Sequence, residues 1–410
     1  MSHTSRIRTA AGCALLIAPL AIFAGACDDG HPLSATPYDA ADQIAFNADD
    51  GGKIDPDKPL EISAKDDDGR ITDVTATDAA GRYVRGELSA DGTRWRSTSP
   101  LAAGAHYTVR VSTEDDDGAP GRRTIGFDTT PAGKQLKVTL GPDSGTYGVG
   151  QPVTAELSHS VKSPEERATV ERALKVDSQP HVEGGWTWAN DKTLHFRPRE
   201  YWPAGATVEV RSQLDGIKVG KRYGGSAKPL KLTIGDRVEA ITDAAAHTLT
   251  VKRNGKVIRT IPVTTGKPGY DTRNGVKVIL AKESFVRMTS ASIGASDFYD
   301  LPVYWATRVT WSGEYLHAAP WSTGSQGAAN VSHGCTGMST EAAKWFFDTV
   351  KVGDVVQVVG SNGDMMTPFD NGFGDWNVDW AKWRKGSAVV PAGSHVDSTP
   401  ADSARLRPSV

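Results

Sequence analysis

Short runs in which apolar and polar residues alternate make up most of residues 41–235. RYVRGEL, HYTVRVST, QLKVTL and TVEVRS are typical, and clusters of Gly, Pro and Asp separate one run from the next. Alternation of this kind predicts short strands with one buried face, as in β-sandwiches. The stretch 95–111 resembles 196–210 in its order of aromatic strand, Pro-containing corner and second strand. We therefore expect two β-sandwich domains, at residues 41–131 and 132–235.

One convincing helix interrupts this strand-rich half. The segment 163–175, SPEERATVERALK, begins with Ser163 in the N-cap position and has Pro164 in its first turn. Serine accepts a hydrogen bond from the first turn, and proline there loses no donor that the helix needs.

A third domain is expected at residues 236–361. TLTVKR and KVIRTIPVTTG flank Asn254-Gly255, the dipeptide that favours a tight β-hairpin turn. STEAAKWFFDTV predicts a short helix with Ser339 as its N-cap and Glu341 in the first turn, and GDVVQVVG predicts a closing strand. The domain is thus mostly β.

The remaining residues, 362–410, form a C-terminal extension and tail. Trp376, Trp380 and Trp383 are spaced i, i+4 and i+7, which puts them on one side of a helix. We expect this apolar stripe to pack on the third domain.

The N-terminus is typical of an export signal. Arg6 and Arg8 precede an apolar run from Ala14 to Ala24, and the polarity changes abruptly after Cys27. AGAC followed by DDGHP resembles a bacterial lipobox, which implies a signal peptide at 1–26, a lipid-modified Cys27 and a linker at 27–40. We therefore expect a lipid anchor in the cell membrane and a chain that faces the cell wall.

Charge excludes one class of partner. The chain has 46 Lys+Arg and 49 Asp+Glu, a net charge of −3. This balance does not indicate the basic surface that binding of nucleic acid requires. The acidic stretches 66–69 and 114–118 lack the ligand spacing of a calcium loop and are interpreted as solvated turns.

Cys335 is the only cysteine beyond residue 27, and it lies in the stretch NVSHGCTGMS. His333 lies two residues before it and His317 eighteen residues before it. An imidazole close to a thiol raises the thiolate fraction, and the thiolate is the nucleophile. Gly334 lets the backbone turn so that the Cys335 amide can address a developing oxyanion. Spacing alone does not choose between the two histidines as the base.

The same residues could be read as a metal site. His317, His333 and Cys335 make a conceivable zinc set, but the chain contains neither HExxH nor paired CxxC. We therefore expect no metal and no cofactor.

At these residues the chain resembles a known family. LHAAPWSTGSQGAANVSHGCTG resembles the signature of bacterial L,D-transpeptidases with a YkuD-type catalytic domain, and TIPVTTGKPGYDTRNG resembles a second family stretch. GDWNVDWAKWRKGSA is similar to the C-terminal extension of the actinobacterial lipoprotein branch. The resemblance implies a mainly β fold with two immunoglobulin-like sandwiches, a β-rich catalytic domain and a short helical extension.

The resemblance also implies roles for individual residues. Cys335 would attack a tetrapeptide stem of peptidoglycan, release D-Ala and pass the acyl group to a second stem as a 3→3 cross-link. His317 would accept the proton, with its ring oriented by the backbone carbonyl that follows. Carbapenem β-lactams would be covalent inhibitors. The other implied site residues are His333, Gly334 and Ser332, and the implied substrate contacts are Tyr299, Ser312, Gly313, Asn330, Trp321 and Met288.

One position departs from the family pattern, because Gly337 stands where an asparagine often lies. A contact to the substrate is then missing or comes from elsewhere, for which Asn330 is a candidate. Two alternatives remain open from the sequence. A cysteine L,D-carboxypeptidase would give the same acyl group to water, and a non-catalytic wall-binding lipoprotein would use neither histidine.

Overall fold

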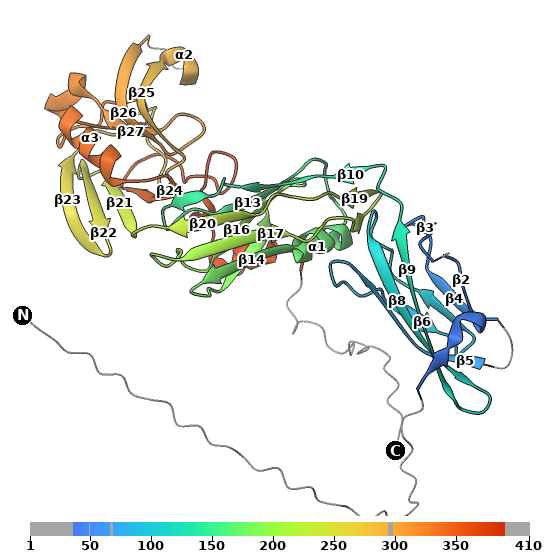
Figure 1. Ribbon diagram of the computed structural model, residues 1–410. Helices are drawn as coiled ribbons and strands as arrows, with labels where there is room; N and C mark the ends of the chain where they lie inside the picture. The colour runs from blue at the N-terminus through green and yellow to red at the C-terminus, as the bar shows by residue number, and fades with distance from the viewer. Residues whose placement is uncertain (1–35, 49, 66–68, 294–297, 390–410) are drawn as a thin grey trace, which may run out of the picture.

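The computed structural model describes residues 36–389 except 49, 66–68 and 294–297. Within them the chain forms three β-rich domains in a row, with the first and third at opposite ends (Figure 1). This confirms the predicted mainly β architecture. The predicted signal peptide, Cys27, most of the linker, the stretch 66–68 and the tail after 389 lie outside the described residues. None of the helices within the described part of the chain has the length and apolarity to span a bilayer.

The first domain is a sandwich of two sheets that enclose Trp95 and Phe127. One sheet has the order β1-β9-β8-β5, with β3 also on β9, and the other has the order β2-β4-β7-β6. The stretch 114–118 forms the turn between β8 and β9, as predicted. The elements are β1 (Tyr38–Asp39), η1 (Ala40–Asp42), β2 (Ile44–Phe46), β3 (Lys53–Ile54), β4 (Glu61–Ala64), β5 (Gly69–Asp78), β6 (Gly86–Leu88), β7 (Arg94–Ser97), β8 (His106–Asp115) and β9 (Pro120–Thr129).

The second domain is a sandwich around Trp186 and Trp202. Its sheets have the orders β11-β13-β16-β15 and β12-β20-β17-β14, and β10-β19-β18 form a small third sheet. Ser163 caps α1 as predicted, but the helix ends at Ala173, because the chain turns directly into a strand. The elements are β10 (Gln135–Leu136), β11 (Val138–Gly141), β12 (Gly145–Tyr147), β13 (Val153–Leu157), α1 (Pro164–Ala173), β14 (Leu174–Gln179), β15 (Gly184–Trp188), β16 (Thr193–Pro198), β17 (Thr207–Ser212), β18 (Lys218–Val219), β19 (Arg222–Gly224) and β20 (Leu230–Ile234).

The third domain packs two sheets and α3 around a shared core. The sheet orders are β23-β22-β21-β29-β24 and β25-β26-β27-β28, and α3 packs on β26 and β27. Asn254 and Gly255 have positive φ angles (50° and 81°), which fits the predicted tight turn. The elements are β21 (Val238–Asp243), β22 (Thr248–Arg253), β23 (Lys256–Pro262), β24 (Gly275–Val278), β25 (Ala281–Thr289), α2 (Ser290–Ile293), β26 (Asp300–Arg308), β27 (Tyr315–Ala318), η2 (Pro320–Ser325), β28 (Thr336–Met338), α3 (Thr340–Thr349) and β29 (Val355–Val359).

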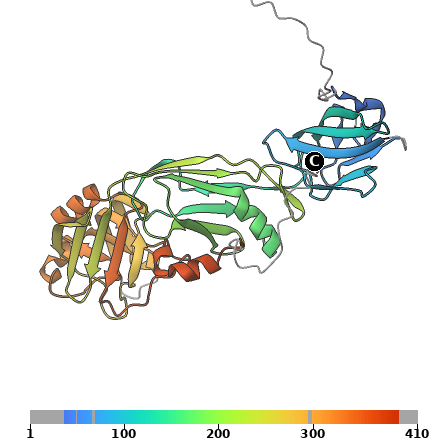
Figure 2. The same ribbon diagram turned by 90° about the horizontal axis from the view of Figure 1, so that it is seen from below.

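The C-terminal extension contains η3 (Asp375–Asn377) and α4 (Trp380–Lys385). The prediction of one continuous helical stripe is wrong, because Asp379 caps a new helix after an extended Val378. The expected packing partner is also wrong, since α4 lies along the second domain (Figure 2). There the tryptophan indoles donate to acceptors of the second domain, and the Arg197 guanidinium lies 4.6–5.5 Å from the three ring centroids.

The second and third domains meet around the loop before β29. Gly148 and Gly150 donate backbone hydrogen bonds to Val352 and Gly353 (2.8 and 2.9 Å). Asp354 is fully buried here, and its Oδ2 accepts the Lys351 N–H (2.8 Å), while Oδ1 has no hydrogen-bond partner among the described residues. Burial raises the pKa of Asp354 from 3.8 to about 7.

This buried carboxyl group predicts how stability depends on pH. Between the unfolded and folded pKa values the folded state holds a proton that the unfolded state has released, so the free energy of unfolding should fall as pH rises from about 4 to 7. We expect Asp354→Asn to flatten this part of the profile in thermal unfolding. Asp348→Asn, at an exposed position on α3, should keep it. The same fall in the Asp354→Asn protein would contradict the prediction.

Candidate active site

The pairing of β27 with β28 brings His317 and Cys335 together. The two strands are parallel, and the register sets His317 opposite Gly337. Cys335 directly precedes β28 and packs against Tyr315, which strand alternation puts on the same side of β27 as His317. The imidazole and the thiol therefore share one face of the sheet.

His317 is held in one orientation. Its Nδ1 donates to the carbonyl oxygen of Ala318 (2.8 Å), the residue that follows it, which leaves Nε2 as the proton acceptor. The side chain is buried, and burial lowers its pKa below 6.5. The imidazole is therefore neutral near neutral pH, the form that a general base requires.

Cys335 packs against Val303, Ala306 and Tyr315, and its Sγ donates to the carbonyl oxygen of Gly313 (3.5 Å). Burial raises the pKa of the thiol to about 12, although a hydrogen bond from the Tyr315 backbone opposes the shift. The expectation that an imidazole would raise the resting thiolate fraction is therefore not met. The site therefore holds a neutral thiol and a neutral imidazole.

Backbone carbonyls of the cysteine loop are fixed by two hydroxyl groups. Ser332 Oγ donates to the Cys335 carbonyl (2.6 Å) and accepts the Gly334 N–H (3.1 Å). Thr272 Oγ1 donates to the Gly334 carbonyl (2.9 Å) and accepts the Gly266 N–H (3.0 Å). Gly334 has a φ of 109°, which side chains rarely allow. Ser332 and Gly334 thus shape the loop that presents the thiol.

His333 lies between two aromatic rings. Its ring centroid is 4.7 Å from that of Tyr270 and 4.9 Å from that of Tyr299. Trp321 is 50% exposed, with its ring 6.0 Å from His317, and Met288 packs against the same small cluster as Cys335. Trp321 thus lies beside the His317 ring and Met288 beside the cluster that Cys335 contacts, while contacts of all these residues with substrate stay predictions.

The turn before β27 is supported by the C-terminal extension. Ser312 donates its backbone N–H to Asn371 Oδ1 (2.7 Å), and Asn371 Nδ2 donates to Ser312 Oγ (2.9 Å). Gly313 follows with a φ of 100° and points its carbonyl at Cys335. Asn371 carried no sequence signal, because it is distant in sequence and lies in a Gly- and Asp-rich stretch.

Asn330 connects its own loop to the segments around residues 244–247 and 265. Its Oδ1 accepts the Thr265 N–H (2.9 Å) and lies 3.0 Å from His247 Nδ1, while Nδ2 donates to the Ala244 carbonyl (2.9 Å). Its amide is engaged on both atoms in this arrangement, so its proposed contact with substrate stays a prediction.

Comparisons with known proteins identify the family of the chain. Residues 52–218 match the family model of the bacterial Ig domain, and residues 237–358 match that of the L,D-transpeptidase catalytic domain. L,D-transpeptidase 2 of Mycobacterium tuberculosis (strain CDC 1551 / Oshkosh) is 33% identical over 402 residues, which cover 94% of this chain and 97% of that relative. The chain belongs to the L,D-transpeptidase family.

Further relatives have the same activity in their names. L,D-transpeptidase 5 of M. tuberculosis (strain ATCC 25618 / H37Rv) is 34% identical over 369 residues, covering 88% of this chain and 80% of the relative. A solved LD transpeptidase in complex with imipenem is 37% identical, with a TM-score of 0.47, and the match covers 54% of this chain and 97% of that one. The protein is thus a transpeptidase enzyme, and its catalytic domain is the third domain.

Gly337, the position at which the sequence departs from the expected family pattern, has no room for a side chain. A Cβ at this position would lie 2.9 Å from the Ala319 Cβ and 3.1 Å from Thr264 Cγ2. Thr264 and Gly337 also exchange two backbone hydrogen bonds (2.9 and 2.8 Å). The chain therefore packs this strand tightly at Gly337.

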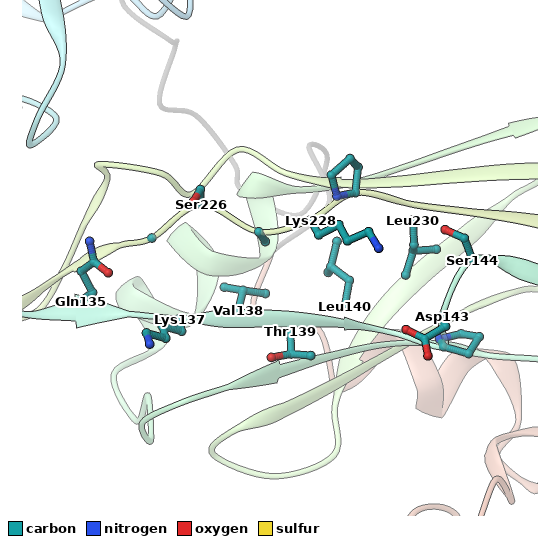
Figure 3. A pocket seen from close by; sticks show the side chains of 14 residues that line it. Gln135, Lys137, Val138, Thr139, Leu140, Asp143, Ser144, Ser226, Lys228 and Leu230 are labelled. Atoms are coloured by element: carbon teal, nitrogen blue, oxygen red, sulfur yellow. The ribbon is translucent and has the colours of Figure 1, made fainter.

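A groove of about 430 Å³ on the second domain lies apart from these residues. It runs between β11 and residues 225–230, with Lys228 and Leu140 among its lining side chains (Figure 3). None of the predicted site residues of this L,D-transpeptidase lines it. The chemistry of the family is therefore assigned to the β27–β28 site.

Thr272 lies within the stretch TIPVTTGKPGYDTRNG, and the fold brings its side chain to the cysteine loop. It is 2% exposed, and Thr272→Val would leave the Gly334 carbonyl and the Gly266 N–H without their shared partner. We expect this change to lower the free energy of unfolding by about 1–3 kcal/mol. Thr207→Val, at an exposed position of β17, should change it by less than about 0.5 kcal/mol. Equal denaturant midpoints for the two variants would contradict this role of Thr272.

Proposed function

We propose that the protein forms 3→3 cross-links in peptidoglycan through a thioacyl-enzyme on Cys335. The observation that carries the proposal is the shared face of Cys335 and His317, with His317 Nδ1 committed to the Ala318 carbonyl. The family supports cross-linking of peptidoglycan as the reaction class. The donor would be a tetrapeptide stem and the leaving group its terminal D-Ala.

Acylation follows from the two neutral groups. As Sγ attacks the carbonyl carbon between the L-centre of the diamino acid and D-Ala, His317 Nε2 takes the thiol proton. The C–N bond then breaks, the same proton passes to the departing amine of D-Ala, and a thioester remains on Cys335. Burial raises the pKa of the thiol and lowers that of the imidazole, so the proton stays on sulfur in the resting enzyme. The proton is therefore transferred during the attack and not before it.

Transfer uses the same groups in reverse. The side-chain amine of a second stem attacks the thioester carbon and gives up a proton, and the thiolate leaves and is reprotonated. His333, held between Tyr270 and Tyr299, would face the incoming amine. Water in place of the amine would make the enzyme a carboxypeptidase, and product analysis separates these outcomes.

The test is to incubate the purified chain with disaccharide-tetrapeptide and weigh the products. We expect a dimer that has lost one D-Ala, and we expect one added drug mass on the Cys335 peptide after treatment with a carbapenem. Cys335→Ala should abolish both signals, because no nucleophile remains. His317→Gln should slow acylation by about a hundredfold or more.

Two outcomes would count against the proposal. Disaccharide-tripeptide without dimer would assign the enzyme to the carboxypeptidase alternative. Wild-type product levels from Cys335→Ala, in a protein that unfolds at the wild-type temperature, would remove the cysteine from the reaction.

We also propose that Cys27 carries a lipid that anchors the enzyme to the outer face of the cell membrane. The support is the basic, apolar and small-residue order of the first 27 residues. Cys27→Ala should move the enzyme from the membrane fraction to the soluble fraction, because a signal peptide without a lipid gives no anchor. An unchanged membrane share for Cys27→Ala would contradict the anchor.

A further inference from the structure

Three charged side chains form a cluster next to the cysteine loop. Lys277 on β24 is fully buried, and Glu314, directly before β27, is 6% exposed. Lys277 Nζ donates to Glu314 Oε2, and Arg273 donates to Glu314 Oε1 from its guanidinium (3.0 Å) and from its backbone N–H (3.1 Å). Two cations and one carboxylate give the cluster one net positive charge.

The chain on either side of Glu314 contacts the sulfur of Cys335. The Gly313 carbonyl accepts the hydrogen bond from Sγ, and the Tyr315 backbone donates to the sulfur. Glu314 also lies against the cysteine loop, since a Cβ at Gly334 would be 3.9 Å from Glu314 Cγ. Fixing Glu314 therefore fixes both backbone groups that the sulfur contacts.

Arg273 connects the cluster to the other side of the cysteine loop. It follows Thr272, whose hydroxyl holds the Gly334 carbonyl, and its guanidinium also donates to Ser312 Oγ (3.3 Å). The carboxylate of Glu314 thus joins three strands or turns that converge on Cys335. Its own backbone N–H donates to Thr310 Oγ1 (2.8 Å), which closes the turn before β27.

Both buried charges act on the thiol. Beyond the dominant effect of burial, the Glu314 carboxylate raises the pKa of Cys335 and the Lys277 ammonium lowers it. Burial also lowers the pKa of Lys277 itself, an effect that the Glu314 charge opposes. A buried ion pair is often replaceable by apolar residues without loss of stability, so stability alone does not account for this one.

We propose that Lys277 and Glu314 are positioning residues for the transpeptidase reaction, which hold Gly313 and Tyr315 against the Cys335 sulfur and balance the charge beside it. Neither side chain needs to touch the substrate. This inference rests on the proposed role of Cys335 as the nucleophile.

The test of the charge balance compares Lys277→Met, Glu314→Gln and the double variant in the full chain. Alkylation of Cys335 by iodoacetamide is followed against pH on the Cys335 peptide, so that Cys13 and Cys27 do not contribute. Removing the cation should slow alkylation at a fixed alkaline pH by about threefold to tenfold, and removing the carboxylate should speed it by a similar factor. The double variant should return close to the wild-type profile.

A purely structural pair would give a different pattern. If the pair were only structural, either single substitution would loosen the site and expose the thiol. Both variants would then shift their alkylation profiles toward that of an ordinary exposed cysteine. Shifts in the same direction would therefore overturn the charge balance. Unchanged profiles in both would also overturn it. Lys344→Met removes a cation from an exposed ion pair with Asp348 on α3 and should leave the profile as it is.

The positioning part is tested separately with Glu314→Asp. This change keeps the charge but shortens the side chain, so it cannot reach Lys277 and Arg273 together. Because the charge stays, the faster alkylation expected of Glu314→Gln should not appear, whereas carbapenem acylation should slow by about tenfold or more. Acylation of Glu314→Asp at the wild-type rate would overturn the proposal. This test remains decisive if Lys277→Met or Glu314→Gln fails to fold.

The two proposals can fail independently. Absence of any carbapenem adduct on the wild-type enzyme would count against the proposed function. Alkylation needs no transpeptidase activity, so its profiles still decide whether Lys277 and Glu314 set the reactivity of the thiol.

Discussion

The parallel pairing of β27 with β28 is the constraint on which the site depends. It sets His317 opposite Gly337, and a slip of one residue would turn the thiol to the other face of the sheet. Several bonds maintain this register: Thr264 pairs with Gly337 through two backbone hydrogen bonds, and Thr272 holds the Gly334 carbonyl. The tight packing at Gly337 follows from the same need, because a side chain there would push the strands apart.

Burial decides the electrostatics of this site more than the imidazole does. It raises the pKa of Cys335 and lowers that of His317, so each group is neutral before the reaction. A resting thiolate is readily oxidised, whereas a protonated thiol is less reactive. The enzyme therefore relies on groups that act when charge develops, such as the Tyr315 amide and the cluster of Lys277, Glu314 and Arg273.

Features local in sequence could be predicted, and features made by distant segments could not. The caps at Ser163 and Ser339, the turn at Asn254-Gly255 and the sandwich pattern depend on neighbouring residues, and the structure has them. The partners of the tryptophans depend on acceptors contributed by the second domain, which no periodicity reveals. Lys277 interrupts an otherwise apolar run, VKVIL, and a cation at such a position indicates a buried partner. Its identity, Glu314, requires the fold.

The second domain is part of the framework of the site as well as a spacer. Trp376 and Trp383 fix the C-terminal extension to this domain, and the buried His195–Asp375 pair (2.7 Å) adds a third connection. The same extension continues to Asn371, which holds Ser312 in the turn before β27. A rotation between the second and third domains would have to break these contacts and would disturb that turn.

The first domain has no such link to the site among the described residues, because its contacts, such as Asp57 with Tyr223 (2.6 Å), end at the second domain. A change in the position of the first domain would therefore leave the geometry around Cys335, which the second domain supports, as it is.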